Sequence, residues 1–352
     1  MDRRVFLTGS AAALLGACAP ARIPLSTAAD AVGFAPVFVA TTRVLDPVTL
    51  WPGKTPAEVV TRLSVPMDID RGRGLVGRSV GPGDARRGRA HLWESGPAFV
   101  EALRADAARQ GTREALVFVH GFNNSIDSSL ARAAQMAQTF EAPVVPVHFA
   151  WASADSPLAY VADRDASLMA RDGLEATLTE VRQAGLRPII LAHSMGAHLV
   201  METLRQMALV GSPVLRDIRG VFLVAPDIDV LVFRSQMRRI PRLPQPFLVL
   251  TNSKDRALAL SRGLSGRRER LGSLADPAPL ADFSITMVDA TAVTGGGDHF
   301  PVGNSPALAG LLADFAQVPS AFETPAGIQD LLAGSVVGVR AITQVVLDPA
   351  GL

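Results

Sequence analysis

The feature that most constrains the fold is a regular alternation of short apolar runs with longer segments of helical periodicity. The runs include EALVFVHGF, APVVPVHFAW and RPIILAHS, and the segments between them, 125–140 and 163–184, carry apolar residues at helical spacing. The runs are continuous, which is typical of parallel strands that are covered on both faces. We therefore predict an α/β fold, in which a doubly wound, mostly parallel sheet carries helices on both faces.

The same pattern extends through most of the 352-residue chain, which is long enough for one large domain or two smaller ones. It predicts a domain over 34–318 and a C-terminal extension over 319–352 that packs against the body or faces a membrane. A strand is expected over 36–44, and residues 45–96, rich in Gly and Pro, are expected to hold a short strand or two among loops. The further elements expected are helices over 97–110, 195–209 and 305–316 and strands in IRGVFLVAPDID, QPFLVLTNSKD and DFSITMVDATAV.

The N-terminus has the features of an export signal. Residues 1–17 carry two arginines and then an apolar stretch that is shorter than the roughly 20 residues of a membrane span. The stretch ends in LGAC, which resembles a bacterial lipoprotein signal that is cleaved before Cys18 with lipid attached to its sulfur, and RRVFL resembles the twin-arginine export motif. Residues 18–33 read as a tether. We expect an exported envelope lipoprotein that faces the periplasm, and Ala19 after the cysteine favours the outer membrane. The alternative is a simple cleaved signal peptide with an incidental cysteine.

Charge and cysteine usage exclude several classes of function. Cys18 is the one cysteine, so the mature chain has no disulfide and no thiolate metal site, and Asp298 and His299 alone do not make a metal site. Arginine clusters occur at 86–89, 238–242 and 267–270, but no aromatic residues are interleaved with them. We therefore expect no nucleic-acid partner, no metal and no cofactor.

A serine stands where one apolar run turns into a helical pattern. In AHSMG, Ser194 lies between Ala192 and Gly196, and small residues are required two positions either side of such a tight strand-to-helix turn. The turn would leave a bare hydroxyl at the carboxyl edge of the sheet, beside the positive end of a helix. Ser194 is therefore a candidate nucleophile; the alternative is a helix N-cap without catalysis.

A serine nucleophile requires a base and an acid. His299, in the glycine-rich TGGGDHFPVG, is the candidate base, whereas His193 should project away from Ser194 and His198 should lie in the core. Because the order in this architecture is Ser, acid, His, the acid should be Asp255 after the penultimate strand, with Asp227 as the alternative.

The developing oxyanion also needs preorganised donors. The backbone N–H of Met195, the residue after the nucleophile, is expected to supply one. The second should come from Phe122 in HGFNN, with Asn123 in reserve, because Gly121 allows that loop a close approach.

The motifs HGFNNS, AHSMG, APDID and NSKDRALALS, in this order, resemble an α/β-hydrolase subfamily of bacterial exported proteins of undefined function that are described as esterase- or lipase-like. Residues TTR at 41–43, YVADR at 160–164 and RERLG at 268–272 also resemble its pattern. The resemblance covers about 36–316 and implies the fold and the triad Ser194, Asp255 and His299. It implies no substrate, and Ala192 departs from the more general Gly-x-Ser-x-Gly pattern.

The sequence therefore predicts a serine hydrolase that cleaves carboxylic esters or thioesters through an acyl-enzyme, with a small ester or acyl compound as substrate. Two alternatives stay open: an envelope lipoprotein that uses the scaffold for binding, and an acyltransferase. Tyr160 and Arg164 can contact substrate or serve as a packed ring and a structural ion pair.

Overall fold

A computed structural model of the chain describes residues 22–27, 33–69, 80–139, 143–266, 268–294, 299, 308, 334–339 and 342–347. The strands are β1 (Ala35–Leu45), β2 (Pro52–Ile69), β3 (Ala85–Arg87), β4 (His91–Trp93), β5 (Glu114–Val119), β6 (Val145–Ala150), β7 (Arg187–His193), β8 (Gly220–Val224), β9 (Phe247–Thr251), β10 (Ile285–Asp289), β11 (Gly334–Val339) and β12 (Ile342–Leu347). The helices are α2 (Gly96–Gln110), α3 (Ile126–Thr139), α4 (Tyr160–Met169), α5 (Arg171–Gln183), α6 (Met195–Leu209), α7 (Val230–Met237) and α8 (Arg256–Leu264).

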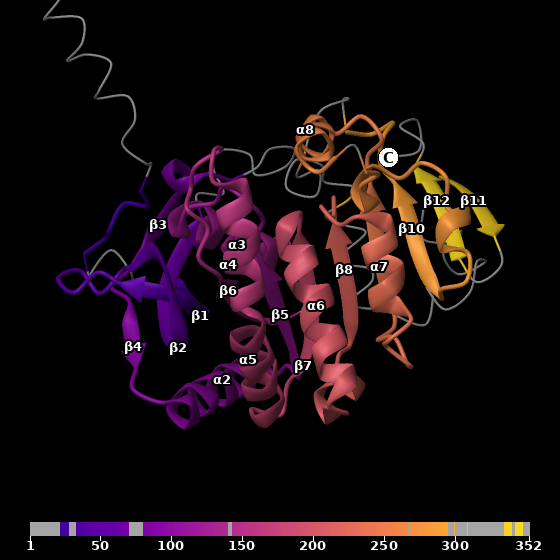
Figure 1. Cartoon of the computed structure of the whole chain (residues 1–352). Coiled ribbons are helices and arrows are strands. Elements are labelled where there is room, and N and C mark those ends of the chain that lie inside the picture. The colour runs from indigo at the N-terminus through magenta and orange to yellow at the C-terminus, as the bar shows by residue number, and fades with distance from the viewer. Residues whose placement is uncertain are drawn as a thin grey trace, which may run out of the picture.

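Within the described residues, all 12 strands form one sheet in the order β11-β12-β10-β9-β8-β7-β5-β6-β1-β2-β3, with β4 paired to β2 (Figure 1). The strands from β12 to β1 in this order run parallel, and β2 and β11 pair antiparallel at the two ends. The prediction of a doubly wound, mostly parallel sheet is confirmed. No helix in these ranges combines the length and apolar character that a membrane span requires.

Alternate residues of each central strand feed two separate cores, which is why the strand sequences are continuously apolar. In β5, Val117 and Val119 pack with α2, α5, α6 and α7, whereas Leu116 and Phe118 pack on the opposite face with α3. The sheet is therefore a rigid, fully covered support for the loops at its edges.

The edges of the sheet differ most from the sequence prediction. Residues 45–96, expected to be mostly loop, contain the 18-residue strand β2. Pro52 and Pro56 are tolerated because they lie in its first half, which is an outer edge, and face the register shifts between Thr41 and Leu45 of β1. The extension predicted over 319–352 contributes β11 and β12 to the sheet, where β12 lies beside β10. Of the predicted helix over 305–316, only residue 308 is described, and it is helical.

The predicted helix over 163–184 is two helices in the structure. Helix α4 ends at Met169, and the next residue, Ala170, has a ψ of −2° that bends the chain before α5 begins at Arg171. This bend lets the start of α4 approach the carboxyl edge of the sheet while α5 covers its face.

The strand order reverses between β5 and β7. The chain passes from β5 to β6 on one side, then returns to place β7 on the other side of β5. In doubly wound sheets, ligands bind at the carboxyl ends of the strands at such a reversal. The loop after β5 and the corner after β7 therefore lie side by side at the expected position of a site.

Candidate active site

Ser194 occupies a strained corner between β7 and α6. Its φ of 52° and ψ of −120° are unusual for a residue with a side chain, and such backbone strain costs about 1–3 kcal/mol. The corner packs against the end of β5 so closely that a Cβ on Gly196 would lie 2.3 Å from the His120 carbonyl oxygen. Ala192, which stands where glycine is more usual, is fully buried near the end of β7.

The hydroxyl of Ser194 is not bare, in contrast to the expectation from the sequence. The residue is only 3% exposed. The imidazole of His299 lies against it, with Nε2 at 2.9 Å from Oγ. The tight turn therefore presents the hydroxyl to a neighbouring side chain.

Asp255 lies on the other side of the same imidazole. Its Oδ2 is 2.7 Å from His299 Nδ1, and its carboxylate is completely buried. Because a carboxylate accepts, Nδ1 carries the proton in this arrangement, and Nε2 is left to accept the proton of Ser194 Oγ. Asp255 also accepts the backbone N–H of Leu258 at the start of α8, which fixes the carboxylate.

His193 supports the backbone of His299. Its Nε2 is 2.8 Å from the His299 carbonyl oxygen, and the two rings meet edge to face. Burial, followed by the neighbouring His299, lowers the pKa of His193 well below its usual value, so the ring is neutral and donates from Nε2. The sequence places His193 away from the Ser194 hydroxyl but gives no sign of this contact.

Asp227, the alternative acid, contacts other partners. Its oxygens accept from Tyr160 Oη at 2.8 Å and Ser261 Oγ at 2.6 Å, and it forms an ion pair with Arg270, Nε at 3.2 Å. The strand order explains the difference from Asp255. Asp255 follows β9, the neighbour of the strand that precedes His299, whereas Asp227 follows β8 and lies beneath Tyr160.

His198 lies in the core below the corner, as the sequence predicts. Burial, followed by the charge of Arg164, lowers its pKa to about 4. Tyr160 is a largely buried ring that packs edge to face on Phe122, with centroids 5.4 Å apart. Tyr160 therefore connects the loop after β5 with Asp227.

The loop after β5 lies directly against Ser194. A Cβ on Gly121 would be 2.8 Å from Ser194 Cβ, so only glycine allows this approach. The Asn124 amide donates to the carbonyls of Gly121 and Phe122 at 3.2 and 2.8 Å. Because peptide N–H and C=O groups point in opposite directions, the N–H groups of Phe122 and Asn123 point away from the Asn124 side chain.

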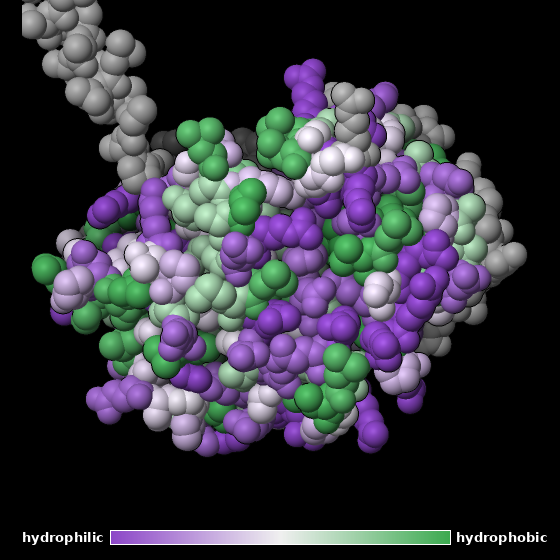
Figure 2. Space-filling model, in the orientation of Figure 1, coloured by the Kyte–Doolittle hydropathy of each residue, from purple (hydrophilic) through white to green (hydrophobic). Residues whose placement is uncertain are grey.

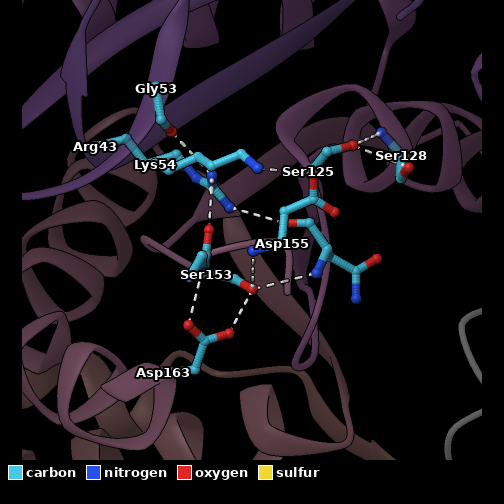
Figure 3. Close-up of polar contacts among 10 residues, drawn as sticks. Arg43, Gly53, Lys54, Ser125, Ser128, Ser153, Asp155 and Asp163 are labelled. Atoms are coloured by element: carbon cyan, nitrogen blue, oxygen red, sulfur yellow. Dashed lines mark hydrogen bonds and ion pairs between the residues drawn. The ribbon is translucent and has the colours of Figure 1, made fainter. Parts of the chain in front are cut away.

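A buried arginine braces this loop from behind (Figure 3). The Arg43 guanidinium donates to the carbonyls of Asn124, Gly53 and Ser153 at 3.1, 3.0 and 3.3 Å. Burial lowers its pKa to about 10, so it stays charged at neutral pH. The loop after β5 is thereby attached to β1, β2 and the end of β6 at one point.

Asp163 completes the brace from helix α4. Its carboxylate accepts from Ser153 Oγ at 2.6 Å and from the Ala154 N–H at 2.7 Å, and Ser153 Oγ in turn accepts the Asn124 N–H at 3.2 Å. The sequence prediction missed this network, although TTR and YVADR contain Arg43 and Asp163. The signal was the presence of charged residues in motifs that the triad did not use.

The predicted lipidation site and the absence of a metal site concern residues that the structure describes only in part. Cys18 and Asp298 lie outside the described residues. Among the residues that are described, no group of three or more His, Cys, Asp or Glu side chains is arranged to hold a metal ion.

A doubly wound sheet with a strained serine corner at its strand reversal, and a histidine from beyond the last central strands beside that serine, defines an α/β hydrolase. Residues 97–312 match the family described as "Alpha/beta hydrolase of unknown function (DUF900)", and the chain belongs to this family.

Solved structures with a related fold are distant. An esterase of Rhizomucor miehei is 12% identical, covers 92% of each chain and has a TM-score of 0.42. A thermostable esterase from Pseudomonas putida is 13% identical, covers 85% of this chain and 84% of its own, and has a TM-score of 0.38. A yden-like hydrolase from Pectobacterium atrosepticum is 19% identical, covers 62% of this chain and 98% of its own, and has a TM-score of 0.37. No curated protein matches the chain.

Proposed function

We propose that this protein is a serine hydrolase that cleaves carboxylic esters through an acyl-enzyme. The observation that carries the proposal is the continuous hydrogen-bonded chain from Asp255 through His299 to Ser194, with distances of 2.7 and 2.9 Å. Its members come from the ends of separate elements, and the carboxylate is buried with its second oxygen engaged by a backbone N–H. Such a series of hydrogen bonds is what activation of a serine hydroxyl requires.

In the proposed reaction, Ser194 Oγ attacks the ester carbonyl as His299 Nε2 takes its proton. Asp255 holds the Nδ1–H and stabilises the imidazolium that forms. The oxyanion of the tetrahedral intermediate accepts hydrogen bonds from the backbone N–H of Met195 and that of Phe122, with Asn123 in reserve. His299 then returns the proton to the leaving alcohol, and water, activated by the same histidine, releases the acid from the acyl-enzyme.

The test is release of nitrophenolate from short-chain p-nitrophenyl esters. The Ser194→Ala variant should lose at least about 10³-fold in kcat, because nucleophile and base act as a unit. Ser212→Ala is the matched control, since Ser212 precedes a turn at the opposite edge of the sheet. Equal turnover by wild type and Ser194→Ala contradicts the proposal.

A fluorophosphonate probe separates this function from a binding role, because only an activated serine reacts with it. Labelling should occur in wild type and disappear in Ser194→Ala. A folded wild-type protein that takes no label would instead favour the lipoprotein that uses the scaffold for binding. Products formed in the presence of added alcohols distinguish hydrolysis from acyl transfer.

We also propose that the chain is exported and lipidated at Cys18, so that it is held at the membrane of the bacterial envelope. The support is the LGAC sequence after a short apolar stretch that begins with two arginines. Metabolic labelling with an alkyne-bearing fatty acid should mark the wild-type protein and leave Cys18→Ser unmarked. Labelling of both proteins, or of neither, contradicts lipidation at this position.

A further inference from the structure

Large apolar side chains stand exposed at the carboxyl edge of the sheet, around the candidate active site. We call five of them the apolar rim: Val48, Leu158, Val161, Leu260 and Leu264, which are 88%, 95%, 73%, 67% and 62% exposed. Figure 2 shows hydrophobic side chains at the upper edge of the molecule, over α8 and over the tops of α3 and α4. Side chains this exposed gain nothing from folding, so their clustering at one edge requires another explanation.

The two main parts of the rim are held together across the site. Tyr160 Oη and Ser261 Oγ are 2.9 Å apart, which joins the start of α4 to α8. Leu158 and Val161 flank Tyr160 in the chain, and Leu260 and Leu264 flank Ser261. Because Tyr160 also packs on Phe122, these parts of the rim lie beside the loop that carries the proposed oxyanion donors.

Helix α8 has the character of a helix that lies on a lipid surface. Of its nine residues, only Leu258 and Ser261 are buried. Its exposed side combines Leu260 and Leu264, one turn apart, with Arg256 and Arg262. Across 253–266 the one carboxylate, Asp255, is buried, so the exposed charges are all positive, and apolar side chains beside arginines are typical of interfacial helices on anionic lipids.

The N-terminal segment enters the fold at the same edge. The Ile23 N–H donates to Asp127 Oδ1 at 2.9 Å, and Ile23 is buried. Asp127 lies in the first turn of α3, just after the carboxyl end of β5, and also accepts from the Trp51 indole. Cys18 precedes Ile23 by five residues, which span at most about 18 Å when extended. A lipid on Cys18 would therefore hold this edge next to the bilayer.

We infer that the carboxyl edge of the sheet is a docking surface for an anionic lipid bilayer, with the apolar rim inserted among the headgroups. The edge of the sheet that carries Ser194 then faces the membrane. Resting on the proposed hydrolase function, this orientation selects acylated, membrane-resident compounds as the substrate class, because such compounds reach Ser194 without crossing water.

The orientation is testable with a single fluorescent label. Cys18 is the one cysteine in the sequence, so the full chain with Cys18→Ser accepts a label at one chosen position. An environment-sensitive fluorophore is attached in one sample to Leu264→Cys and in another to Val210→Cys, which is 69% exposed beyond α6 at the opposite edge. Vesicles of phosphatidylglycerol and phosphatidylethanolamine should shift the emission of the first label to the blue and leave the second unchanged.

Equal shifts at both positions, or none at either, would overturn the proposal. Loss of the shift on purely phosphatidylcholine vesicles, or in high salt, is expected from the arginines of α8. The same measurement in a Ser194→Ala chain should give the same shift. The vesicle measurement can therefore exclude docking while ester hydrolysis is still observed, and ester hydrolysis can be absent while docking is still observed.

A second pair of variants tests the rim itself, with the label at Leu158→Cys. The double substitution Leu260→Ser and Leu264→Ser should raise the lipid concentration needed for a half-maximal shift about tenfold, because two apolar side chains no longer enter the interface. The matched control is Leu209→Ser with Val210→Ser, which removes two exposed apolar residues from the opposite edge. If the two double variants need the same lipid concentration for a half-maximal shift, the proposal is contradicted. It is also contradicted if the protein is a dimer in solution and only the rim substitutions dissociate it.

Discussion

The two sides of the candidate site are held in different ways. The loop after β5 is fixed by a buried network, in which Arg43 and Ser153 bind the backbone of Asn124 and Asp163 in turn holds Ser153. On the other side, the described contacts of His299 are its ring nitrogens to Ser194 and Asp255 and its carbonyl to His193. One side is held through its backbone by buried side chains, and the described contacts of the other side centre on the imidazole of His299.

This difference matches the chemistry that each side is proposed to perform. Oxyanion donors act through fixed position, and their stabilisation falls when they move by a fraction of an ångström. An imidazole that carries a proton from serine to a leaving group needs defined partners at both nitrogens more than a rigid backbone. Disrupting the base side should therefore reduce activity with the fold intact, whereas disrupting the brace should reduce both.

The largest effect should come from Asp255→Asn. We expect kcat to fall about 10⁴-fold, because an amide in place of the carboxylate favours the wrong tautomer of His299. Thermal stability should change little, since asparagine also caps helix α8 well. Steady-state kinetics and thermal unfolding measure the two quantities. Asp229→Asn is the control, because Asp229 caps α7 through Leu231 N–H and Val232 N–H; if it loses as much activity as Asp255→Asn, the distinction fails.

An intermediate effect is expected from Arg43→Lys. An ammonium group cannot reproduce the planar set of bonds to the carbonyls of Asn124, Gly53 and Ser153. The loop after β5 should shift, and kcat should fall about tenfold with KM nearly unchanged, because the proposed donors act only in the transition state. The melting temperature should fall as well.

Lys54→Met provides the comparison for the brace. Lys54 belongs to the same part of Figure 3, but its ion pair with Asp155 is at the surface, with the lysine 55% exposed. Such pairs contribute little to stability. If Lys54→Met and Arg43→Lys lower kcat equally, the loop is not held by the buried guanidinium.

The last effect is a pH dependence of stability on the braced side. Burial lowers the pKa of His148 in β6, whose ring contacts Phe118 of β5 and Ser129 of α3, from 6.5 to about 3. Above pH 6.5 the ring is neutral in both states, so its contribution is fully present. Below pH 6.5, His148 is protonated in the unfolded chain but stays neutral in the folded protein. The free energy of unfolding therefore falls by up to about 1.4 kcal/mol per pH unit towards pH 3.

Urea unfolding of wild type and His148→Gln at pH 7, 6 and 5 measures this dependence. The variant should start less stable at pH 7 and lose less stability on acidification. If the free energies of unfolding of the two proteins fall equally between pH 7 and pH 5, His148 is not the source of the pH dependence.

The main features of the fold were predictable because they are local. Continuous apolar runs require burial on both faces, and the helical spacing between them requires crossover connections. The long strand β2 was missed because the Pro- and Gly-rich sequence over 45–96 reads as loop, and only its pairing with β1 shows that part of it is a strand. Strands β11 and β12 were missed for a related reason, since a short apolar run at the end of a chain does not reveal whether a sheet edge is open beside it.

The candidate site divides in the same way. The order of Ser194, Asp255 and His299 and the small residues at the corner were visible in the sequence, whereas the brace was not, because Arg43 meets partners that are 10, 81 and 110 residues away. Strand position in the sequence favoured Asp255 as the acid but left Asp227 open. Both follow apolar strands, and only the position of the neighbouring strand and of Tyr160 separates them.

By itself, then, the sequence determined the sheet, its crossovers, the serine corner and the set of side chains able to act there, because propensity, periodicity and turn chemistry operate over a few residues. Tertiary structure alone separated Asp255 from the alternative Asp227, and it alone decided that Ser194 is covered, how Arg43 fixes the loop after β5, and that exposed leucines from α8 and the start of α4 share one edge. These depend on distances between residues far apart in the chain, which no local pattern specifies.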